Sequence, residues 1–132
     1  MFAYLWVAIG GGLGAMARYW CSGIAAILIG ETFPWGTLVV NVVGSFMIGF
    51  FATVTGPGGR IHVSSAASQF VMIGFCGGFT TFSSFSLQTL NLVSDGEWVR
   101  AGANIAGSLV CCLVAVWAGY IVAASLNTMK WI

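Results

Sequence analysis

The stretch Gly74–Ser86, with the sequence GFCGGFTTFSSFS, lies inside a hydrophobic segment that is long enough to cross a membrane. Its paired glycines and its run of Thr and Ser are a poor composition for a regular membrane helix. In lipid, irregular backbone is tolerated only where protein buries it or where it lines a wet cavity. The stretch is therefore expected to be either a tight packing site or part of a pore.

The composition of the whole chain indicates an integral membrane protein. Of its 132 residues, 59% are hydrophobic and only 5% are charged, whereas soluble domains carry about 25% charged residues. Four segments reach the roughly 20 apolar residues that a membrane helix needs. We place these spans near Ala3–Ile29, Pro34–Val54, Ala67–Val93 and Trp98–Leu126. The sequence thus predicts an all-α protein with one four-helix domain over residues 1–132.

The charges and the chain ends add further expectations. A net charge of +1 argues against a nucleic-acid partner. The N-terminal apolar run has no basic start and is too long for a signal peptide. Ser94 and Asp95 are expected to cap the last helix. Gly10 and Gly14 have the small-xxx-small spacing that lets membrane helices approach closely.

Lys and Arg near the ends of the spans leave the orientation balanced. With four crossings, Arg60 and Lys130 fall on one side of the membrane, and Arg18 and Arg100 fall on the other. The ordinary interpretation is a weak signal that one boundary residue decides. The alternative is dual topology, in which the chain inserts both ways and pairs as an antiparallel dimer.

Polar residues recur on one face of the second span. Thr37, Asn41 and Ser45 are four residues apart, and such residues share a helix face. Ser108 and Asn104 repeat the pattern in the fourth span. Such side chains either join helices by hydrogen bonds or line a pore, where their donors solvate an anion.

The opening stretch itself carries aromatic rings and hydroxyl groups. Phe82 and Phe85 are three residues apart and face the same way. A phenylalanine stripe is usually packing, but the positive edge of an aromatic ring also suits a small anion. Thr81, Ser83 and Ser84 add possible hydroxyl donors. A helix break within Gly77–Thr81 would free backbone carbonyls, which are ligands for a hard cation.

Other side chains narrow the class of function. Arg18 is the only charge well within a span; it either snorkels to the interface, caps carbonyls or attracts anions at a pore mouth. The three acids fall in loops or at helix ends, which argues against proton coupling and against a small multidrug exporter. The sequence offers no nucleophile–base pair and no metal cluster for catalysis, so we expect no enzyme. A passive channel remains, with a structural membrane subunit as its competitor.

Three blocks of this sequence resemble the Fluc (CrcB-type) fluoride channels of microbes. They are GGGLGAMARY (Gly10–Tyr19), GTLVVNVVGSFMIG (Gly36–Gly49) and the opening block GFCGGFTTFSSFS (Gly74–Ser86). The resemblance implies an antiparallel, dual-topology homodimer with two pores in the plasma (inner) membrane of a microbe. It also implies passive export of fluoride, which relieves fluoride toxicity in the cytoplasm.

The same resemblance implies roles for individual residues. Phe82 and Phe85 match the phenylalanines whose ring edges line the pores, and Asn41 matches the pore asparagine. Ser108 matches a polar position of the fourth helix, and Arg18 matches an arginine near a pore vestibule. Gly77 and Thr80 match a helix break whose backbone carbonyls hold one structural sodium ion between two inverted subunits. Thr37, on the polar face of the second span, and Ser83 and Ser84, next to the rings, complete the expected fluoride-binding set from the pattern of the residues and not from the resemblance.

Overall fold

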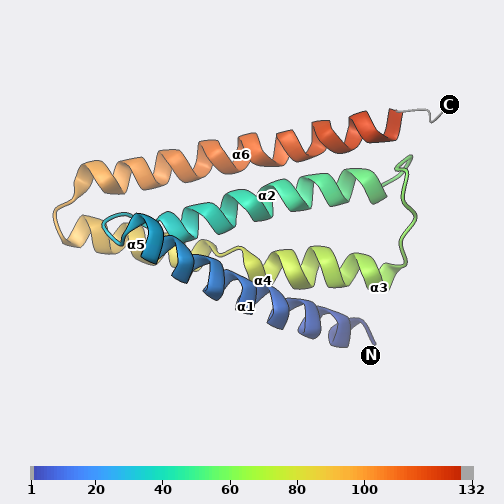
Figure 1. Cartoon of the computed structure of the whole chain (residues 1–132), viewed down its shortest axis with the longest axis horizontal. Helices are drawn as coiled ribbons and strands as arrows, with labels where there is room; N and C mark the ends of the chain where they lie inside the picture. The colour runs from blue at the N-terminus through green and yellow to red at the C-terminus, as the bar shows by residue number, and fades with distance from the viewer. Residues whose placement is uncertain (1, 129–132) are drawn as a thin grey trace.

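Long helices, drawn side by side in Figure 1, make up most of the protein. A computed structural model describes residues 2–128, so Lys130 lies outside the described residues. The helices are α1 (Phe2–Ile29), α2 (Trp35–Thr55), α3 (Ser65–Ser68), η1 (Gln69–Cys76), α4 (Gly77–Phe79), α5 (Phe82–Ser94) and α6 (Trp98–Thr128). Helix α1 begins and α6 ends at the same end of the bundle (Figure 1), as an even number of crossings requires.

Four helical stretches are long and apolar enough to cross a membrane, and this confirms the predicted number of spans. They are Phe2–Ile29, Trp35–Thr55, Ser65–Ser94 and Trp98–Thr128. The third stretch is composite, because α3, the wider π-helix η1, α4 and α5 follow one another along it. A π-helix is rare and is found frequently at functional sites.

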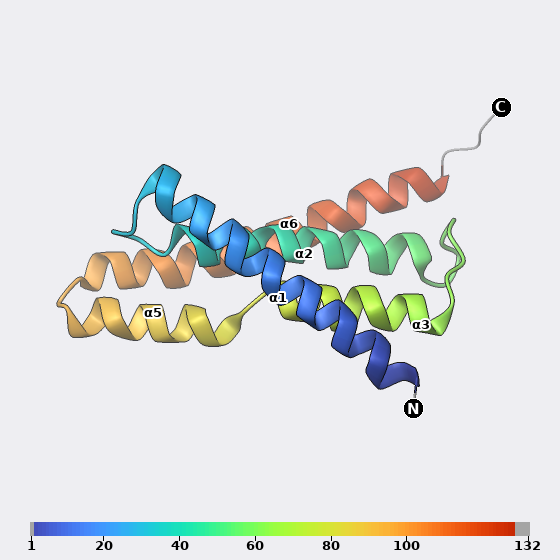
Figure 2. The same cartoon turned by 60° about the horizontal axis from the view of Figure 1, so that its bottom comes forward.

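The third stretch is interrupted at Thr80–Thr81, where Figure 2 shows the ribbon leaving the helix between α4 and α5. Thr80 (φ −87°, ψ 158°) and Thr81 (φ −154°, ψ 112°) both have extended backbone. The interruption thus falls within the expected Gly77–Thr81, at its C-terminal end, since Gly77 still has helical angles (φ −64°, ψ −36°). Two other glycines of this stretch, Gly74 and Gly78, are needed for close packing.

Helix α1 crosses the third stretch at very short range. A Cβ on Gly14 would overlap the carbonyl oxygen of Phe75, and a Cβ on Gly78 would overlap that of Gly11. The close approach that the spacing of Gly10 and Gly14 predicts is thus present, although it lies within one chain. Small residues make such contact possible in membranes, where van der Waals packing rather than water exclusion holds helices together.

Helices α2 and α6 form the most extensive helix pair of the bundle. A Cβ on Gly49 would overlap the carbonyl oxygen of Val116, and a Cβ on Gly119 would overlap that of Phe46. Asn127 joins the C-terminal ends of these two helices, because its Nδ2 donates to the carbonyl of Thr53 at 3.1 Å. Its Oδ1 accepts from the backbone N–H of Arg60 at 3.0 Å.

The turn between α5 and α6 differs from the expected cap. Ser94 is the last residue of α5, and Asp95 closes that helix instead of capping α6. The N–H of Gly96 donates to the carbonyl of Val93 and that of Glu97 to the carbonyl of Leu92, which is the Schellman arrangement of a helix C-terminus. Gly96 has a φ of +77°. This left-handed backbone position suits glycine. Ser94, Asp95 and Gly96 therefore mark the end of α5 and not the start of α6.

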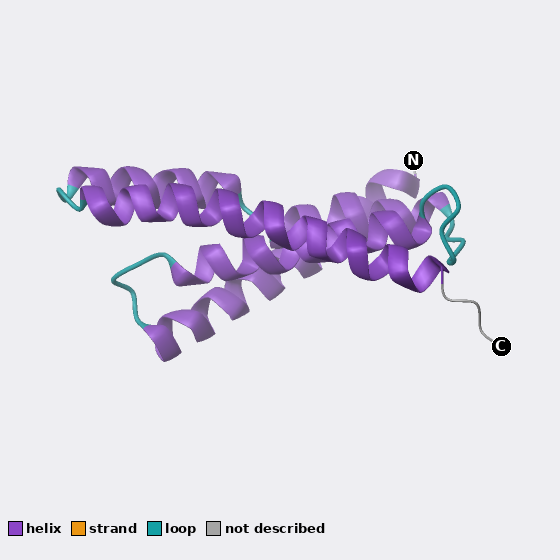
Figure 3. Ribbon diagram, turned by 90° about the horizontal axis from the view of Figure 1, so that it is seen from above, coloured by secondary structure: helices purple, strands orange, loops and turns teal. Residues whose placement is uncertain are grey.

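Two helical hairpins diverge at the end of the bundle away from the start of α1, as Figure 3 shows from above. One is formed by α1 and α2, and the other by α5 and α6. Helix α5 consequently has no buried residue within the single chain. Its partners within the chain are mainly on α6, so one face of α5 is open.

Candidate functional site

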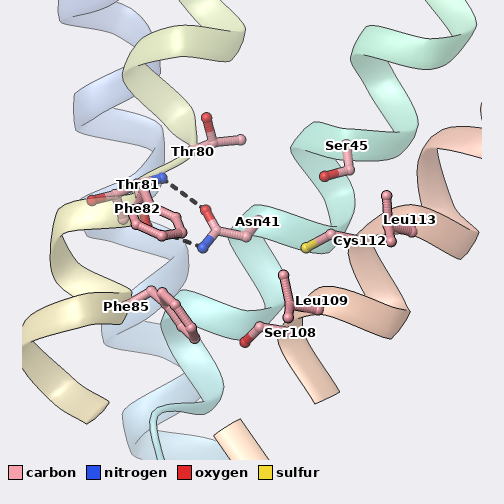
Figure 4. Close-up of a pocket in the computed structure, with 10 residues that line it drawn as sticks. All are labelled: Asn41, Ser45, Thr80, Thr81, Phe82, Phe85, Ser108, Leu109, Cys112 and Leu113. Atoms are coloured by element: carbon pink, nitrogen blue, oxygen red, sulfur yellow. Dashed lines mark hydrogen bonds between the residues drawn. The ribbon is translucent and has the colours of Figure 1, made fainter. Parts of the chain in front are cut away.

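A pocket of about 300 Å³ opens at the interruption of the third stretch. Figure 4 shows the side chains that converge on it from α2, α5, α6 and the extended residues between α4 and α5. None of the residues that line it is charged: Asn41, Ser45, Thr80, Thr81, Phe82, Phe85, Ser108, Leu109, Cys112 and Leu113. The pocket therefore joins apolar walls to a few neutral hydrogen-bonding groups.

Asn41 clamps the interrupted backbone at the edge of this pocket. Its Oδ1 accepts from the N–H of Thr81 at 2.7 Å, and its Nδ2 donates to the carbonyl of Thr81 at 3.1 Å (Figure 4). The extended residue thus recovers two hydrogen bonds that a continuous helix would have supplied. A carboxamide has two N–H donors, and the second has no acceptor among residues 2–128. Asn41 is therefore both a structural clamp and a remaining donor at the pocket.

The interruption also leaves backbone carbonyls without partners. Because the N–H of Thr81 goes to Asn41, the carbonyl of Gly77 does not receive its helical hydrogen bond. The N–H and the hydroxyl of Thr80 both donate to the carbonyl of Cys76, at 3.0 and 2.9 Å. The carbonyls of Gly77 and Thr80 accept no hydrogen bond from the described residues. Gly77 is exposed, and a Cβ there would meet nothing.

Two phenylalanine rings stand at the pocket on the first turn of α5. The ring centroids of Phe82 and Phe85 are 5.3 Å apart, and the rings are tilted by 47°. Phe82 is 74% exposed in the single chain. Both rings predicted for the site therefore lie together, and Phe82 borders the open face of α5.

The hydroxyl groups next to these rings form the N-terminal cap of α5. Thr81 caps α5, because its Oγ1 accepts from the N–H of Ser84 at 3.2 Å. The same oxygen lies 3.2 Å from the hydroxyl of Ser83 and 3.1 Å from that of Ser84. Ser83 and Ser84, both predicted for the site, support the cap and do not line the pocket.

On the opposite wall, α2 and α6 contribute Ser45, Ser108 and Cys112. Ser108 is only 7% exposed, and its hydroxyl donates to Oδ1 of Asn104 at a long 3.4 Å. Ser45 and Thr81 also line the pocket, although the predicted fluoride-binding set does not contain them. The four-residue spacing of Ser45 from Asn41 and the position of Thr81 beside the two rings are the sequence features that indicate them.

Two predicted residues lie away from this pocket. Thr37 is buried and lines a second pocket with Ser22 and Gln88, between the two diverging hairpins. Arg18 is half-buried, and its Nε donates to the carbonyl of Gly78 at 3.0 Å. Of the three interpretations of Arg18, the structure favours the carbonyl cap.

Comparison with known proteins gives consistent matches along nearly the whole chain. Residues 5–120 match the family described as CrcB-like protein, Camphor Resistance (CrcB). A protein of Opitutus terrae named Fluoride-specific ion channel FluC is 64% identical over 130 residues, which cover 98% of each chain. A protein of Methylocella silvestris with the same name is 60% identical, over 96% of this chain and 97% of its own. One of Rhodospirillum rubrum, named likewise, is 55% identical over 94% and 96%.

Proposed function

Because this chain belongs to the CrcB-like family, we propose that it is a passive, fluoride-selective channel. It is a multi-pass membrane protein of a transport family and not an enzyme. The observation that carries the proposal is the uncharged pocket at Thr80–Thr81, where hydrogen-bond donors and two phenylalanine rings lie around an interrupted helix. Purified protein in liposomes provides the test, because fluoride release above that of protein-free liposomes is expected.

The chemistry of the pocket suits a small, strongly hydrated anion. A channel must replace the water around fluoride with other donors. The second Nδ2 hydrogen of Asn41 and the hydroxyl of Ser108 are donors of this kind, and the positive edges of Phe82 and Phe85 add to them. Without a fixed positive charge, binding stays weak enough for release, which conduction requires. A narrow bore with donors spaced for a small ion would disfavour chloride.

Passive transport agrees with the positions of the acids. The three acids of the sequence, Glu31, Asp95 and Glu97, all lie in loops. Proton-coupled transporters use a titratable group within the membrane. Flow would then follow the electrochemical gradient of fluoride. In the plasma (inner) membrane of a microbe this would export fluoride whenever the cytoplasm accumulates it.

A second copy of the chain is part of the proposal. Phe82 and Ser83 are exposed in the single chain, and α5 buries no residue. Lipid cannot solvate an ion or the hydroxyl groups of such a path, so protein must cover this face. The balanced basic residues at the span ends favour an inverted copy. Since each copy brings its own pocket, the antiparallel homodimer would have two pores.

The unpartnered carbonyls of Gly77 and Thr80 fit a structural sodium ion. Backbone oxygens are the ligands that hard cations prefer, and both accept no hydrogen bond from residues 2–128. Two carbonyls from each of two inverted chains would give four ligands. Arg18 holds the neighbouring carbonyl of Gly78, which leaves these two for the ion. Bound there, sodium would supply positive charge that joins the two chains.

The assembly predicts two results on the intact protein. Reporter tags at the C-terminus should be found on both sides of the membrane, and cross-linking should capture a dimer in sodium buffer. Replacing sodium with a bulky organic cation should weaken this dimer, because four carbonyl dipoles would then face one another uncompensated. A C-terminus on one side only would contradict dual topology. A dimer of equal stability without sodium would contradict the structural ion.

A further inference from the structure

A chain of side-chain hydrogen bonds runs behind the pocket and joins α6 to α5. Asn104 is only 2% exposed, and its Nδ2 donates to Oγ1 of Thr89 at 2.8 Å. The hydroxyl of Thr89 donates to the carbonyl of Phe85 at 2.8 Å. At the other end, the hydroxyl of Ser108 donates to Oδ1 of Asn104 at 3.4 Å. Phe85 and Ser108 line the pocket, whereas Thr89 and Asn104 do not.

The direction of each hydrogen bond in this chain follows from Thr89. A hydroxyl has one proton, and that of Thr89 is given to the carbonyl of Phe85. Its oxygen can therefore only accept from Asn104, so the NH₂ of the Asn104 carboxamide must face Thr89. The carbonyl end of the same carboxamide then faces Ser108. Thr89 thus determines that Ser108 faces the carbonyl oxygen of the Asn104 carboxamide and not its NH₂ group.

This orientation determines where the proton of Ser108 points. The Oδ1 of Asn104 draws it away from the pocket, but a separation of 3.4 Å makes the hydrogen bond weak. An anion in the pocket can draw the proton back by rotation of the hydroxyl alone. If the carboxamide were reversed, its NH₂ would donate to the oxygen of Ser108, and the proton of Ser108 would no longer be held by Oδ1 of Asn104.

We propose that Thr89 and Asn104 are positioning residues that keep the Ser108 proton off the pocket until an anion enters. They would thereby weaken anion binding enough for rapid release, which conduction requires. The proposal rests on the proposed fluoride conduction. What it adds is that Thr89 acts on the anion through Asn104 and Ser108.

The variant Thr89→Val removes the hydroxyl and keeps the shape of the side chain. With Thr89 no longer accepting, the carboxamide of Asn104 can reverse and donate to Ser108. Conductance of the dimer in planar bilayers, measured against fluoride concentration, should then saturate at a several-fold lower concentration. The maximal conductance should fall several-fold as well. Thr89→Ser keeps the hydroxyl and should behave like the wild type.

The controls separate this role from a general loss of stability. Thr53→Val removes a hydroxyl that makes the same contact to a carbonyl four residues earlier, at 2.8 Å, and should change neither parameter. In a Ser108→Ala background, Thr89→Val should have no further effect, because the group it acts through is gone. If Thr89→Val fails to assemble, Thr89→Ala serves the same test.

Two outcomes would overturn the inference while leaving the proposed function intact. One is a conducting Thr89→Val dimer with unchanged saturation and unchanged maximal conductance. The other is the same shift in saturation when Ser108→Ala is already present. A wild-type dimer that conducts no fluoride would instead contradict the proposed function itself.

Discussion

Replacing Phe82 or Phe85 with Ile should slow fluoride release from liposomes roughly tenfold for each ring, while the dimer stays intact. Isoleucine keeps the apolar volume but has no ring quadrupole, so the positive edge that faces the anion is lost. A tenfold change corresponds to about 1.4 kcal/mol, which is reasonable for one weak electrostatic contact in a site that excludes water. The two rings lie 5.3 Å apart, so the double variant is not expected to be additive.

A matched pair of rings on α2 provides the control for this prediction. Phe46 and Phe50 are stacked with their centroids 6.3 Å apart, and neither lines the pocket. Phe46→Ile should therefore leave fluoride release close to the wild-type rate. Unchanged release from both Phe82→Ile and Phe85→Ile would remove the ring edges from the account.

Replacing Asn41 with Leu should have a larger effect, with fluoride release reduced about a hundredfold or more. Leucine has a similar size but makes neither hydrogen bond to Thr81. Each unsatisfied buried backbone group costs about 1–3 kcal/mol, so the extended residues would lose their position. The donor that Asn41 presents to the pocket would be lost at the same time.

A charge change at the same position separates these two effects. In Asn41→Asp a carboxylate oxygen can still accept from the N–H of Thr81, although the second oxygen cannot donate to the Thr81 carbonyl, so assembly should survive better than in Asn41→Leu. Its negative charge at the pocket would repel an anion, and release should remain very low. Release near the wild-type rate from Asn41→Asp would contradict an anion path beside Asn41.

Asn127 is the natural control for Asn41, because its carboxamide also makes two backbone hydrogen bonds. These bonds go to Thr53 and Arg60 at one end of the bundle, away from the pocket. Asn127→Leu should lower thermal stability in detergent, yet leave fluoride release per assembled dimer unchanged. A loss of release equal to that of Asn41→Leu would mean that the Asn41 effect is only structural.

Much of the architecture could be predicted from the sequence, because hydrophobic length and glycine spacing are local signals. The four spans and the close approach at Gly14 both follow from such patterns. The helix interruption could be predicted only to a range of five residues. A break within Gly77–Thr81 is expected, and extended backbone occurs at its last two residues, Thr80 and Thr81. Asn41, which is 40 residues away in sequence, stabilises it there.

The site was predictable only in part, for a similar reason. Phe82, Phe85, Asn41 and Ser108 were predicted and meet at one pocket. Ser83 and Ser84 were predicted because they neighbour the two rings, but hydroxyl groups next to a helix start are also caps, and these two support Thr81. Helical periodicity gives the face on which a side chain lies. It cannot say which of several neighbouring hydroxyl groups is already engaged.

Two other functions for such a membrane bundle make different predictions. A structural subunit would use the same glycines and hydroxyl groups for packing and would carry no ion. A multidrug exporter would move its substrate only with a proton gradient, although Glu31, Asp95 and Glu97 lie in loops. Ion flux in the absence of any proton gradient distinguishes both from a passive channel.

The most direct measurement loads liposomes with fluoride, reconstitutes the purified chain at low density and follows release with a fluoride electrode. Valinomycin and potassium compensate the charge, and a parallel experiment with chloride uses a chloride electrode. Passive, selective conduction predicts rapid fluoride release without a proton gradient and chloride release no faster than from protein-free liposomes. Fluoride release that equals the protein-free rate would contradict the account.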